Sequence, residues 1–460
     1  MTSSAPGLSR GGRVLLLAHQ SPVGARTMDA VAVALERATA ARDAAWTALA
    51  SGRVDQETTL GDRSSRCTVR TIRLRERGAF QAGFGNQVLW PLCHFFPNRC
   101  SFQPALWSAF RRANEGFAAA ARGLAGAGDV VWINDFHLAL VPGLLRAAGA
   151  AARVGIFWHV PFPPPSVFGV CPWRAEILGG LLGADVVGVQ TEEDAASFLA
   201  CVRDLLDLPT MDDPPRVRLP DREVRVAALP LGIDAERLGA QAADASVRTD
   251  AERLRAGVGA EIIVLSLDRL DYAKGLNEGL LGYERFLDRH AEWRRRVALI
   301  QITVPSQFHV PALPGLKRTI EESVGRVIGR FTYEGRSPLV YLYTALDPGR
   351  LSAYYAAADV ALVTPLRDGM NLVAKEYVAC HGSGDAVLVL SEFAGAAREL
   401  SGALAVNPYD PESIRRQLHA AVTMAPDERR RRMRGLAARV AERDVHWWTA
   451  RFLDLLADGA

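Results

Sequence analysis

The sequence is poor in the features that mark secreted, membrane-spanning and nucleic-acid-binding proteins. Its 460 residues include only six cysteines, and no two of these form a C-x-x-C pair. We therefore expect buried, reduced thiols in a cytoplasmic protein rather than a disulfide framework. No apolar run approaches the ~20 residues that a membrane span requires, and the polar start of the chain shows no signal-peptide pattern. The net charge of +3 is too small to favour a nucleic acid or a membrane as partner.

What the sequence does contain is an alternation of strand-like and helix-like segments, interrupted by a Pro- and Gly-containing stretch at 230–234. This alternation predicts an α/β protein with two parallel, helix-covered sheets that bind ligands at the carboxyl ends of their strands. We expect one Rossmann-like domain over 1–233, a second over 234–440, and a last helix over 441–460 that packs back on the first domain. The predicted strands are 13–18, 130–133, 154–158, 186–189, 224–228, 261–266, 298–303, 339–342, 360–363 and 387–390, and a long Ala-rich helix is predicted at 28–50.

The most informative segment runs from Thr364 to Tyr377. An apolar strand precedes it, an Asp-Gly pair breaks the chain, and a helix begins at Asn371. This order places free backbone N–H groups and the positive end of a helix dipole at the end of a strand, which is an anion site. An Asp-Gly turn alone is more often structural, so the prediction depends on the whole run. Lys375 suits a phosphate and Glu376 suits a diol. The expected donor-binding residues are Asp368, Gly369, Met370, Asn371, Leu372, Val373, Lys375 and Glu376.

A second charged segment, Leu267 to Gly275, follows the first strand of the second domain. Arg269 and Lys274 lie five residues apart across a turn, so both can converge on one diphosphate. Fixed cations stabilise the charge that develops on a leaving pyrophosphate, and they do so without a metal. The alternative interpretation is a solvated, charged turn. The presence of the Thr364–Tyr377 run in the same domain favours the binding site.

Polar and aromatic residues in the first domain are weaker candidates when each is taken alone. His159 ends an apolar strand, but a lone His in such a place is usually a satisfied core residue. Asp135 and His137 follow another strand, where an Asp is often a helix cap. Trp90, in the run Phe84 to Pro91, would by itself be assigned to the core. These residues gain a functional interpretation only from the family that their surroundings resemble.

From about Phe80 to Trp448 the chain resembles the trehalose-6-phosphate synthases. The runs around Arg269 and Asp368 are similar to that family's nucleotide-sugar segments, and the runs around His159, Asp135 and Trp90 are similar to its H-I-P-F-P, W-x-H-D-Y-H and F-S-N-x-V-L-W-P segments. The resemblance implies a GT-B glycosyltransferase that moves glucose from a nucleotide donor, UDP-glucose or GDP-glucose, with retention at the anomeric carbon. One departure is that Asn134 stands in place of the family's first His in the second of these runs.

The resemblance also implies roles for single residues. Arg269 and Lys274 act on the leaving diphosphate, His159 contacts the sugar, and Asp135 orients the acceptor hydroxyl, with His137 as a structural hydrogen-bonding residue. In that family the leaving phosphate itself helps to deprotonate the acceptor. This agrees with the lack here of a catalytic carboxylate pair, a D-x-D segment or a His/Cys ligand cluster. We therefore expect neither a metal nor a cofactor beyond the nucleotide sugar.

Several departures from the family pattern fall near the acceptor. The first strand leads to Ala18-His-Gln instead of a phosphate-binding Arg, and Gly24 is followed by no second Gly. Gln81 stands in place of a Tyr, and Gln307, followed closely by His309, in place of a second phosphate-binding Arg. Because Gln supplies no charge and no planar fork of donors, phosphate binding should weaken. These departures predict that glucose 6-phosphate is a poor acceptor relative to some other polyol, cyclitol or amino sugar. The residues expected to line the acceptor site are Trp90, Gln81, Asp135, Gln307 and His309, and Gly24 is expected at the donor phosphates.

The function predicted from the sequence is thus glucosyl transfer from a nucleotide donor to a sugar or sugar-phosphate acceptor. One alternative is a relative that glucosylates glycerol 3-phosphate or couples a cyclitol or an amino sugar in a natural-product pathway. A second alternative is a catalytically idle relative that only binds or regulates. Intact Arg269, Lys274, Asp368 and Glu376 argue against the idle relative. The expected partners are small-molecule sugars, and a homo-oligomer is left open.

Overall fold

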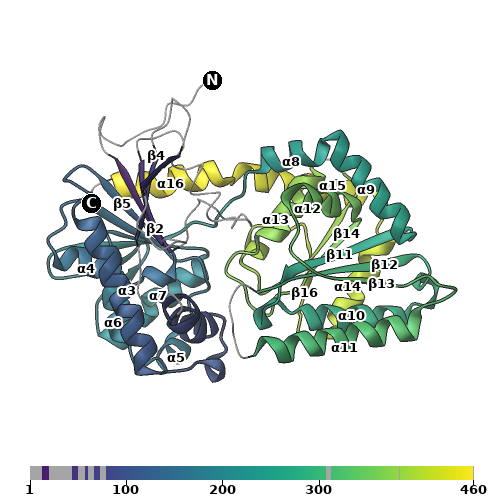
Figure 1. Cartoon of the computed structure of the whole chain (residues 1–460), viewed down its shortest axis with the longest axis horizontal. Helices are drawn as coiled ribbons and strands as arrows, with labels where there is room; N and C mark the ends of the chain where they lie inside the picture. Colours follow the sequence, from purple (N-terminus) through teal and green to yellow (C-terminus); the bar gives the residue numbers. More distant parts are fainter. Residues whose placement is uncertain are drawn as a thin grey trace. The chain divides into compact units, whose positions relative to one another are not determined.

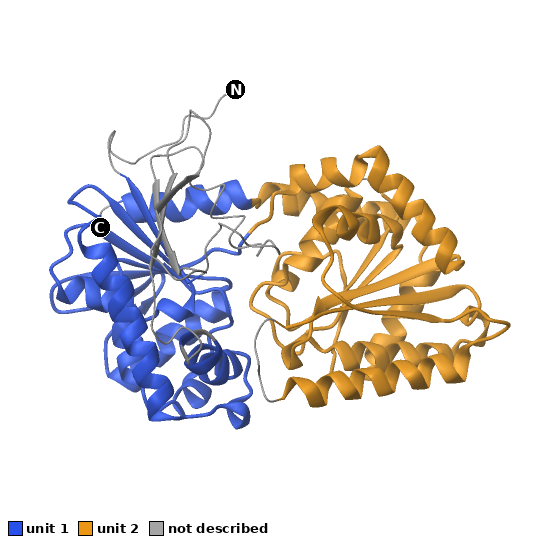
Figure 2. Ribbon diagram, viewed as in Figure 1, with its two compact units in different colours: residues 1–231, 445–460 blue, residues 232–444 orange. Residues whose placement is uncertain are grey.

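The chain divides into two compact units, the first formed by Met1–Leu231 and Val445–Ala460 and the second by Gly232–Asp444 (Figure 2). The computed structural model describes residues 13–19, 44–49, 57–60, 67–72, 79–306, 312–382 and 384–458, with backbone only at 44–49, 57–60, 67–72, 79 and 81. The chain passes from one unit to the other twice, once after Leu231 and once before Val445. Among the helices described, none is both long enough and apolar enough to cross a membrane.

The first unit is built on a sheet with the strand order β3-β4-β2-β1-β5-β6-β7-β10-β9-β8 (Figure 1). The seven central strands, β4, β2, β1, β5, β6, β7 and β10, run parallel to one another. Strand β3 pairs antiparallel with β4 at one edge, and β9 and β8 add antiparallel pairs at the other. The strands are β1 Val14–Ala18, β2 Ala44–Leu49, β3 Glu57–Leu60, β4 Cys67–Ile72, β5 Val130–Asn134, β6 Arg153–Phe157, β7 Val186–Val189, β8 Thr210–Asp212, β9 Pro215–Arg218 and β10 Glu223–Ala228. The helices are α2 Trp90–Cys93, α3 Pro104–Arg122, α4 Val141–Ala147, α5 Pro165–Phe168, α6 Arg174–Leu181, α7 Glu192–Leu206 and α16 Val445–Ala457.

One predicted element is wrong in this unit. The sequence analysis extended an Ala-rich helix over 28–50, whereas residues 44–49 form strand β2, which pairs with β1 on one side and β4 on the other. Alanine favours a helix only by a few tenths of a kcal/mol over most residues. Two complete ladders of backbone hydrogen bonds outweigh that preference. Residues 28–43 lie outside the described part of the chain.

The second unit contains an all-parallel sheet with the order β13-β12-β11-β14-β15-β16. Apolar clusters cover both faces: Tyr283 and Ile320 pack on one, Tyr355 and Met433 on the other. Because both faces are buried, the strands are almost wholly apolar until their carboxyl ends. The strands are β11 Ile262–Arg269, β12 Val297–Val304, β13 Leu339–Tyr343, β14 Val360–Val363, β15 Val387–Ser391 and β16 Leu404–Val406. The helices are α8 Ala235–Ala243, α9 Ala245–Val258, α10 Leu276–Arg289, α11 Leu313–Phe331, α12 Pro348–Ala357, α13 Leu372–His381, α14 Pro411–Thr423 and α15 Pro426–Glu442.

Helix α16 follows the second unit in sequence but packs on the sheet of the first. The Trp448 ring is fully buried, with its centroid 5.1 Å from that of Trp132 on β5 and 4.9 Å from that of Phe157 on β6. The helix can approach because Gly155 and Gly188 have no side chain: a Cβ built on Gly155 would lie 2.6 Å from a methyl carbon of Leu456. Helix α16 is therefore part of the first unit's core.

Candidate active site

In the second unit, the charged residues gather where β11 and β14 end. Lys274 follows β11, and its Nζ donates to Asp368 Oδ2 at 2.5 Å and lies 3.7 Å from Asp268 Oδ1. Burial alone lowers the pKa of Lys274, but the two carboxylates outweigh burial and raise its pKa above the usual value. Lys274 is thus a fixed cation held between two acids.

Asp368 organises the turn that leads into α13. Its Oδ1 accepts from the Met370 backbone N–H at 3.2 Å, and its Oδ2 accepts from the Asn371 side-chain amide at 3.1 Å. Asn371 has a left-handed backbone with a φ of 67°, and its Oδ1 caps the helix by accepting from the Ala374 N–H at 3.0 Å. The helix therefore begins at the position that the sequence analysis predicted, with the dipole's positive end at the carboxyl end of β14.

Two glycines let the neighbouring loops close tightly around this turn. A Cβ built on Gly395 would lie 1.8 Å from the carbonyl oxygen of Gly369, and one built on Gly275 would lie 1.9 Å from that of Thr364. Gly275 also has a φ of 59°, a conformation that favours glycine. The loops after β11, β14 and β15 therefore hold one another in place.

Arg269 is the last residue of β11 and is exposed. Its backbone N–H donates to Asp268 Oδ1 at 2.8 Å, and its charge acts on both Asp268 and Lys274. The structure therefore brings the two predicted cations, Arg269 and Lys274, to the same end of β11. Their contact with a diphosphate stays a prediction.

Lys375 and Glu376 occupy different surroundings on the first turn of α13. Glu376 is half-buried and accepts a hydrogen bond from the Tyr355 hydroxyl at 2.7 Å; burial raises the pKa of its carboxyl. Lys375 is buried and forms an ion pair with Glu399, and burial lowers its pKa although Glu399 opposes this. The structure gives Lys375 a partner inside the fold, so a phosphate would have to replace Glu399. Its predicted phosphate contact remains untested.

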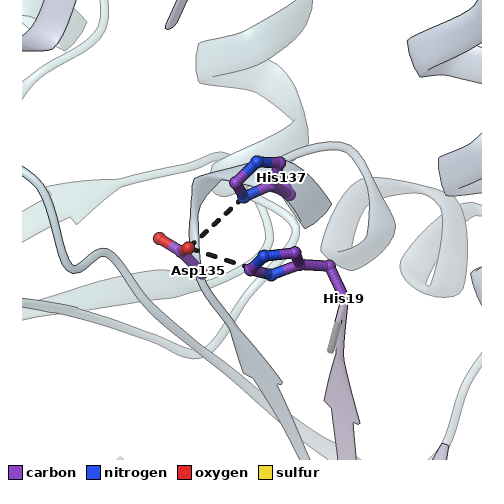
Figure 3. Close-up of side chains that lie close together, drawn as sticks. All are labelled: His19, Asp135 and His137. Atoms are coloured by element: carbon purple, nitrogen blue, oxygen red, sulfur yellow. Dashed lines mark hydrogen bonds and ion pairs between the residues drawn. The ribbon is translucent and has the colours of Figure 1, made fainter. Parts of the chain in front are cut away.

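In the first unit, Asp135 lies with two imidazoles where β1 and β5 end (Figure 3). His137 Nδ1 lies 3.3 Å from Asp135 Oδ2, and His19 Nδ1 lies 3.9 Å from the same oxygen. Burial alone raises the pKa of Asp135, but hydrogen bonding to His137 and the charges of His137 and His19 outweigh it and lower the pKa to about 2. Asp135 is therefore ionised at neutral pH.

His159 is held from both sides by side-chain amides. Gln190 Nε2 donates to His159 Nδ1 at 3.2 Å, which leaves the ring proton on Nε2, and Nε2 donates to Asn134 Oδ1 at 2.8 Å. Burial lowers the pKa of His159 to about 4, although Asp135 acts in the opposite direction. His159 is thus neutral at pH 7, and a sugar hydroxyl would have to share or replace the contact with Asn134.

Among the remaining residues predicted at the acceptor and at the donor phosphates, Trp90 belongs to the described part of the chain. Trp90 begins α2 half-buried, with its ring centroid 6.4 Å from that of Phe136, the residue after Asp135. Gly24, Gln307, His309 and the side chain of Gln81 lie outside the described part of the chain.

Several supporting residues were missed by the sequence analysis. Gln190 directly follows strand β7, and its Oε1 accepts from the Leu231 N–H at 2.9 Å; its place after a buried parallel strand was the available signal. Asn114, fully buried on α3, donates to the carbonyl of His137 at 3.1 Å. A polar residue on the apolar face of a helix was the signal there. Nothing in the sequence pairs Tyr355 with Glu376 or Glu399 with Lys375.

The pattern of glycosyltransferase family 20 matches residues 21–458. The chain belongs to glycosyltransferase family 20. It is 43% identical over 376 residues to a bifunctional trehalose-6-phosphate synthase/phosphatase of Thermoproteus tenax, covering 81% of this chain and 51% of that protein. It is 40% identical over 386 residues to a trehalose-6-phosphate synthase of Mycolicibacterium smegmatis, covering 82% of this chain and 77% of that protein. The chain thus spans about half the length of the T. tenax relative.

Solved structures of trehalose-phosphate synthases share the fold over almost the whole chain. The E. coli trehalose-6-phosphate synthase bound with UDP-2-fluoro glucose superposes with a TM-score of 0.91 at 32% identity, covering 98% of this chain and 100% of that one. An α,α-trehalose-phosphate synthase of Burkholderia xenovorans in complex with glucose 6-phosphate superposes with a TM-score of 0.90 at 30% identity, covering 97% of this chain and 100% of that one. The predicted GT-B fold and the resemblance to trehalose-6-phosphate synthases are confirmed.

Proposed function

We propose that this family 20 chain transfers glucose from UDP-glucose to glucose 6-phosphate with retention at the anomeric carbon. The observation that carries the proposal is that Lys274, held by Asp368, lies beside the capped start of α13 at the carboxyl end of a parallel sheet. A cation and a helix N-terminus at this end of a sheet suit a nucleoside diphosphate. UDP is favoured over GDP as the donor nucleotide because the E. coli relative is bound with UDP-2-fluoro glucose.

On the donor side, the chain's own residues supply the charge that the leaving group needs. Arg269 and Lys274 stabilise the developing diphosphate, and the backbone N–H groups at the start of α13 bind its oxygens. Glu376, oriented by Tyr355, accepts hydrogen bonds from a diol such as that of ribose. The carboxylate of Asp368 holds Lys274 and the turn at Asn371 in a fixed geometry, so little rearrangement is needed when the bond breaks.

On the acceptor side, we propose that Asp135 accepts a hydrogen bond from an acceptor hydroxyl and that neutral His159 donates one to the sugar. The low pKa of Asp135 keeps it a weak base. The leaving phosphate, rather than Asp135, therefore takes the proton of the attacking hydroxyl on the same face of the sugar.

A matrix of nucleotide-glucose donors against acceptors, read by mass spectrometry, tests the proposal. We expect UDP and a disaccharide phosphate from UDP-glucose with glucose 6-phosphate, and an α,α linkage by NMR. Failure to release a nucleoside diphosphate from any donor would support an idle relative instead. Faster reaction with glycerol 3-phosphate, a cyclitol or an amino sugar would support the alternatives, which the comparisons do not favour.

We further propose that the protein acts in the cytoplasm on small molecules alone. The described cysteines, Cys93, Cys100, Cys171, Cys201 and Cys380, are all free thiols. Burial raises the pKa of Cys201 to about 12, so this thiol is unreactive, as expected of a core residue in a reducing compartment.

A further inference from the structure

A row of hydrogen-bonded groups crosses the carboxyl ends of four neighbouring parallel strands in the first unit. Strands β5, β6, β7 and β10 are adjacent in the sheet. Asn134 ends β5, His159 lies shortly after β6, Gln190 directly follows β7, and Leu231 lies shortly after β10. Each member of the row is hydrogen-bonded to the next. The sheet therefore sets the spacing of the row, and its three polar side chains are buried.

The direction of the hydrogen bonds is decided at the Leu231 end of the row. A backbone N–H can only donate, so Gln190 must turn its amide oxygen toward Leu231, where Oε1 accepts at 2.9 Å. The amide N–H group of Gln190 must then face His159 Nδ1, at 3.2 Å. A reversed amide would bring two donors together at Leu231. The orientation of Gln190 is thus fixed by the backbone and not by the histidine.

A donor that faces Nδ1 limits the states that are open to His159. Nδ1 must accept and therefore carries no proton, so the proton of the neutral ring is on Nε2, which donates to Asn134 Oδ1 at 2.8 Å. In the imidazolium both ring nitrogens donate, and its Nδ1–H would point at the N–H group of Gln190. The row therefore disfavours both the charged ring and the tautomer with its proton on Nδ1.

The other neighbours of His159 do not select this state. The rings of Phe157 on β6 and Trp448 on α16 lie with their centroids 4.7 Å and 5.9 Å from that of the imidazole, and neither ring titrates. Burial lowers the pKa of His159, and the charge of Asp135 acts in the opposite direction. Neither effect distinguishes between the two neutral tautomers. Gln190 does, and it also opposes the protonation that Asp135 favours.

We propose that Gln190 is a positioning residue that keeps His159 an uncharged hydrogen-bond donor, with its proton on Nε2. Such a donor gives the sugar a hydrogen bond without placing a positive charge beside it. The charge matters because a sugar becomes oxocarbenium-like when its glycosidic bond breaks, and a nearby imidazolium would repel it. The effect on the sugar rests on the proposed function, whereas the protonation state of His159 does not.

The protonation state is measured by nitrogen-15 NMR of the full chain, labelled on histidine, with H159Q to identify the signals of His159. We expect an unprotonated Nδ1 and a protonated Nε2 at pH 7. Q190E should place a proton on Nδ1, because one carboxylate oxygen still accepts from the Leu231 N–H and the other can then accept only from His159. N134D makes the same amide-to-carboxylate change on the other side of the ring. It is the matched control and should leave Nδ1 unprotonated.

A proton on Nδ1 in the unaltered chain or in N134D, or an unprotonated Nδ1 in Q190E, would overturn the role of Gln190. Q190M serves in place of Q190E if the latter does not fold, as judged by circular dichroism. Because Q190M removes the N–H group that faces Nδ1, His159 should then take up its second proton at a higher pH than in the unaltered chain. An unchanged titration of His159 in Q190M would likewise overturn the role.

Activity separates this role from one in packing. Q190E should lower kcat/KM by a factor of ~10 or more, about the value of one hydrogen bond, because a proton on Nδ1 either charges the ring or leaves Nε2 without its proton. H159Q should itself be less active, and adding Q190E to it should change kcat/KM by less than a factor of ~2, since the amide of Gln does not titrate. An equal loss from Q190E with and without H159Q would assign Gln190 to the fold alone. A chain that releases no nucleoside diphosphate but shows the expected NMR signals would instead refute the proposed function.

Discussion

The two units hold opposite arrangements of charge at the ends of their sheets. In the second unit a lysine lies between two carboxylates, Asp268 and Asp368, whereas in the first a carboxylate, Asp135, lies among imidazoles. The two carboxylates raise the pKa of Lys274 above its usual value, so the first arrangement holds a cation at neutral pH. In the second, the pKa of Asp135 is lowered to about 2, so its carboxylate is ionised at neutral pH. The comparison teaches that the proposed donor site is built around a fixed cation and the proposed acceptor site around a fixed anion.

Removing the fixed cation should have the largest effect. Lys274→Ala deletes the charge that we propose faces the leaving diphosphate and leaves Asp268 and Asp368 to repel it, so turnover should fall by a factor of ~10² or more. The measurement is kcat with UDP-glucose, alongside circular dichroism to show that the fold is intact. Lys317→Ala, which removes a lysine from an exposed ion pair on α11, is the control. Near-normal turnover of the Lys274 variant would remove Lys274 from the leaving-group site.

On the acceptor side, His159 should lower stability in mild acid. The pKa of His159 is about 4 in the fold against 6.5 for the free side chain. The unfolded chain therefore binds this proton first, and the contribution of His159 to the free energy of unfolding should fall by about 3 kcal/mol as the pH drops from about 6.5 to 4. Asp194, whose pKa burial raises to about 6, acts in the opposite direction over this range, and Asp135, with its pKa near 2, contributes only at lower pH. The measurement is therefore the stability of the unaltered chain relative to His159→Gln in urea, and this difference should fall as the pH drops.

A smaller effect is expected from restoring the charge that the family pattern has at position 307, which we expect at the acceptor. Gln307→Arg should lower the KM for glucose 6-phosphate by a factor of ~10 or more, since a charge-assisted hydrogen bond to phosphate contributes ~1.5–3 kcal/mol. The KM for UDP-glucose should not change. Gln103→Arg, at an exposed position of the first unit, controls for net charge. An unchanged KM for glucose 6-phosphate in the Gln307 variant would mean that this position does not face the acceptor phosphate.

The smallest expected effect is that of a chelator. Because we propose that Arg269, Lys274 and the start of α13 act on the diphosphate, EDTA should leave turnover unchanged in metal-free buffer. Turnover before and after dialysis against EDTA, with magnesium and manganese added back, is the measurement. Complete loss that magnesium restores would contradict catalysis by fixed cations.

The sequence predicted those parts of this structure that local pattern decides. Strand β14 and the start of α13 lie where the apolar run, the Asp-Gly break and the capping Asn371 indicated, because each signal acts over a few residues. The short strands β8, β9 and β16 were missed, since three or four residues carry too little periodicity.

Pairings across the fold could not be predicted in the same way. Lys274 and Asp368 are 94 residues apart, and only the neighbouring positions of β11 and β14 in the sheet bring them together. The ion pair of Lys375 with Glu399 was missed for the same reason. The sequence identified Lys375 as a charged group and assigned it to a phosphate, but it did not indicate that Glu399 is its partner. Local chemistry identified the charged groups but not the partners that neutralise them.

The position of α16 has a consequence for how the protein is made. The second unit is one continuous segment, Gly232–Asp444, whereas the first needs Val445–Ala457, which is translated later than the rest of that unit. The sheet of the first unit is therefore completed only when Trp448 covers Trp132 and Phe157. Until then its sheet exposes apolar surface, so chaperones that bind nascent chains should be engaged by the earlier-made unit for longer than by the later one.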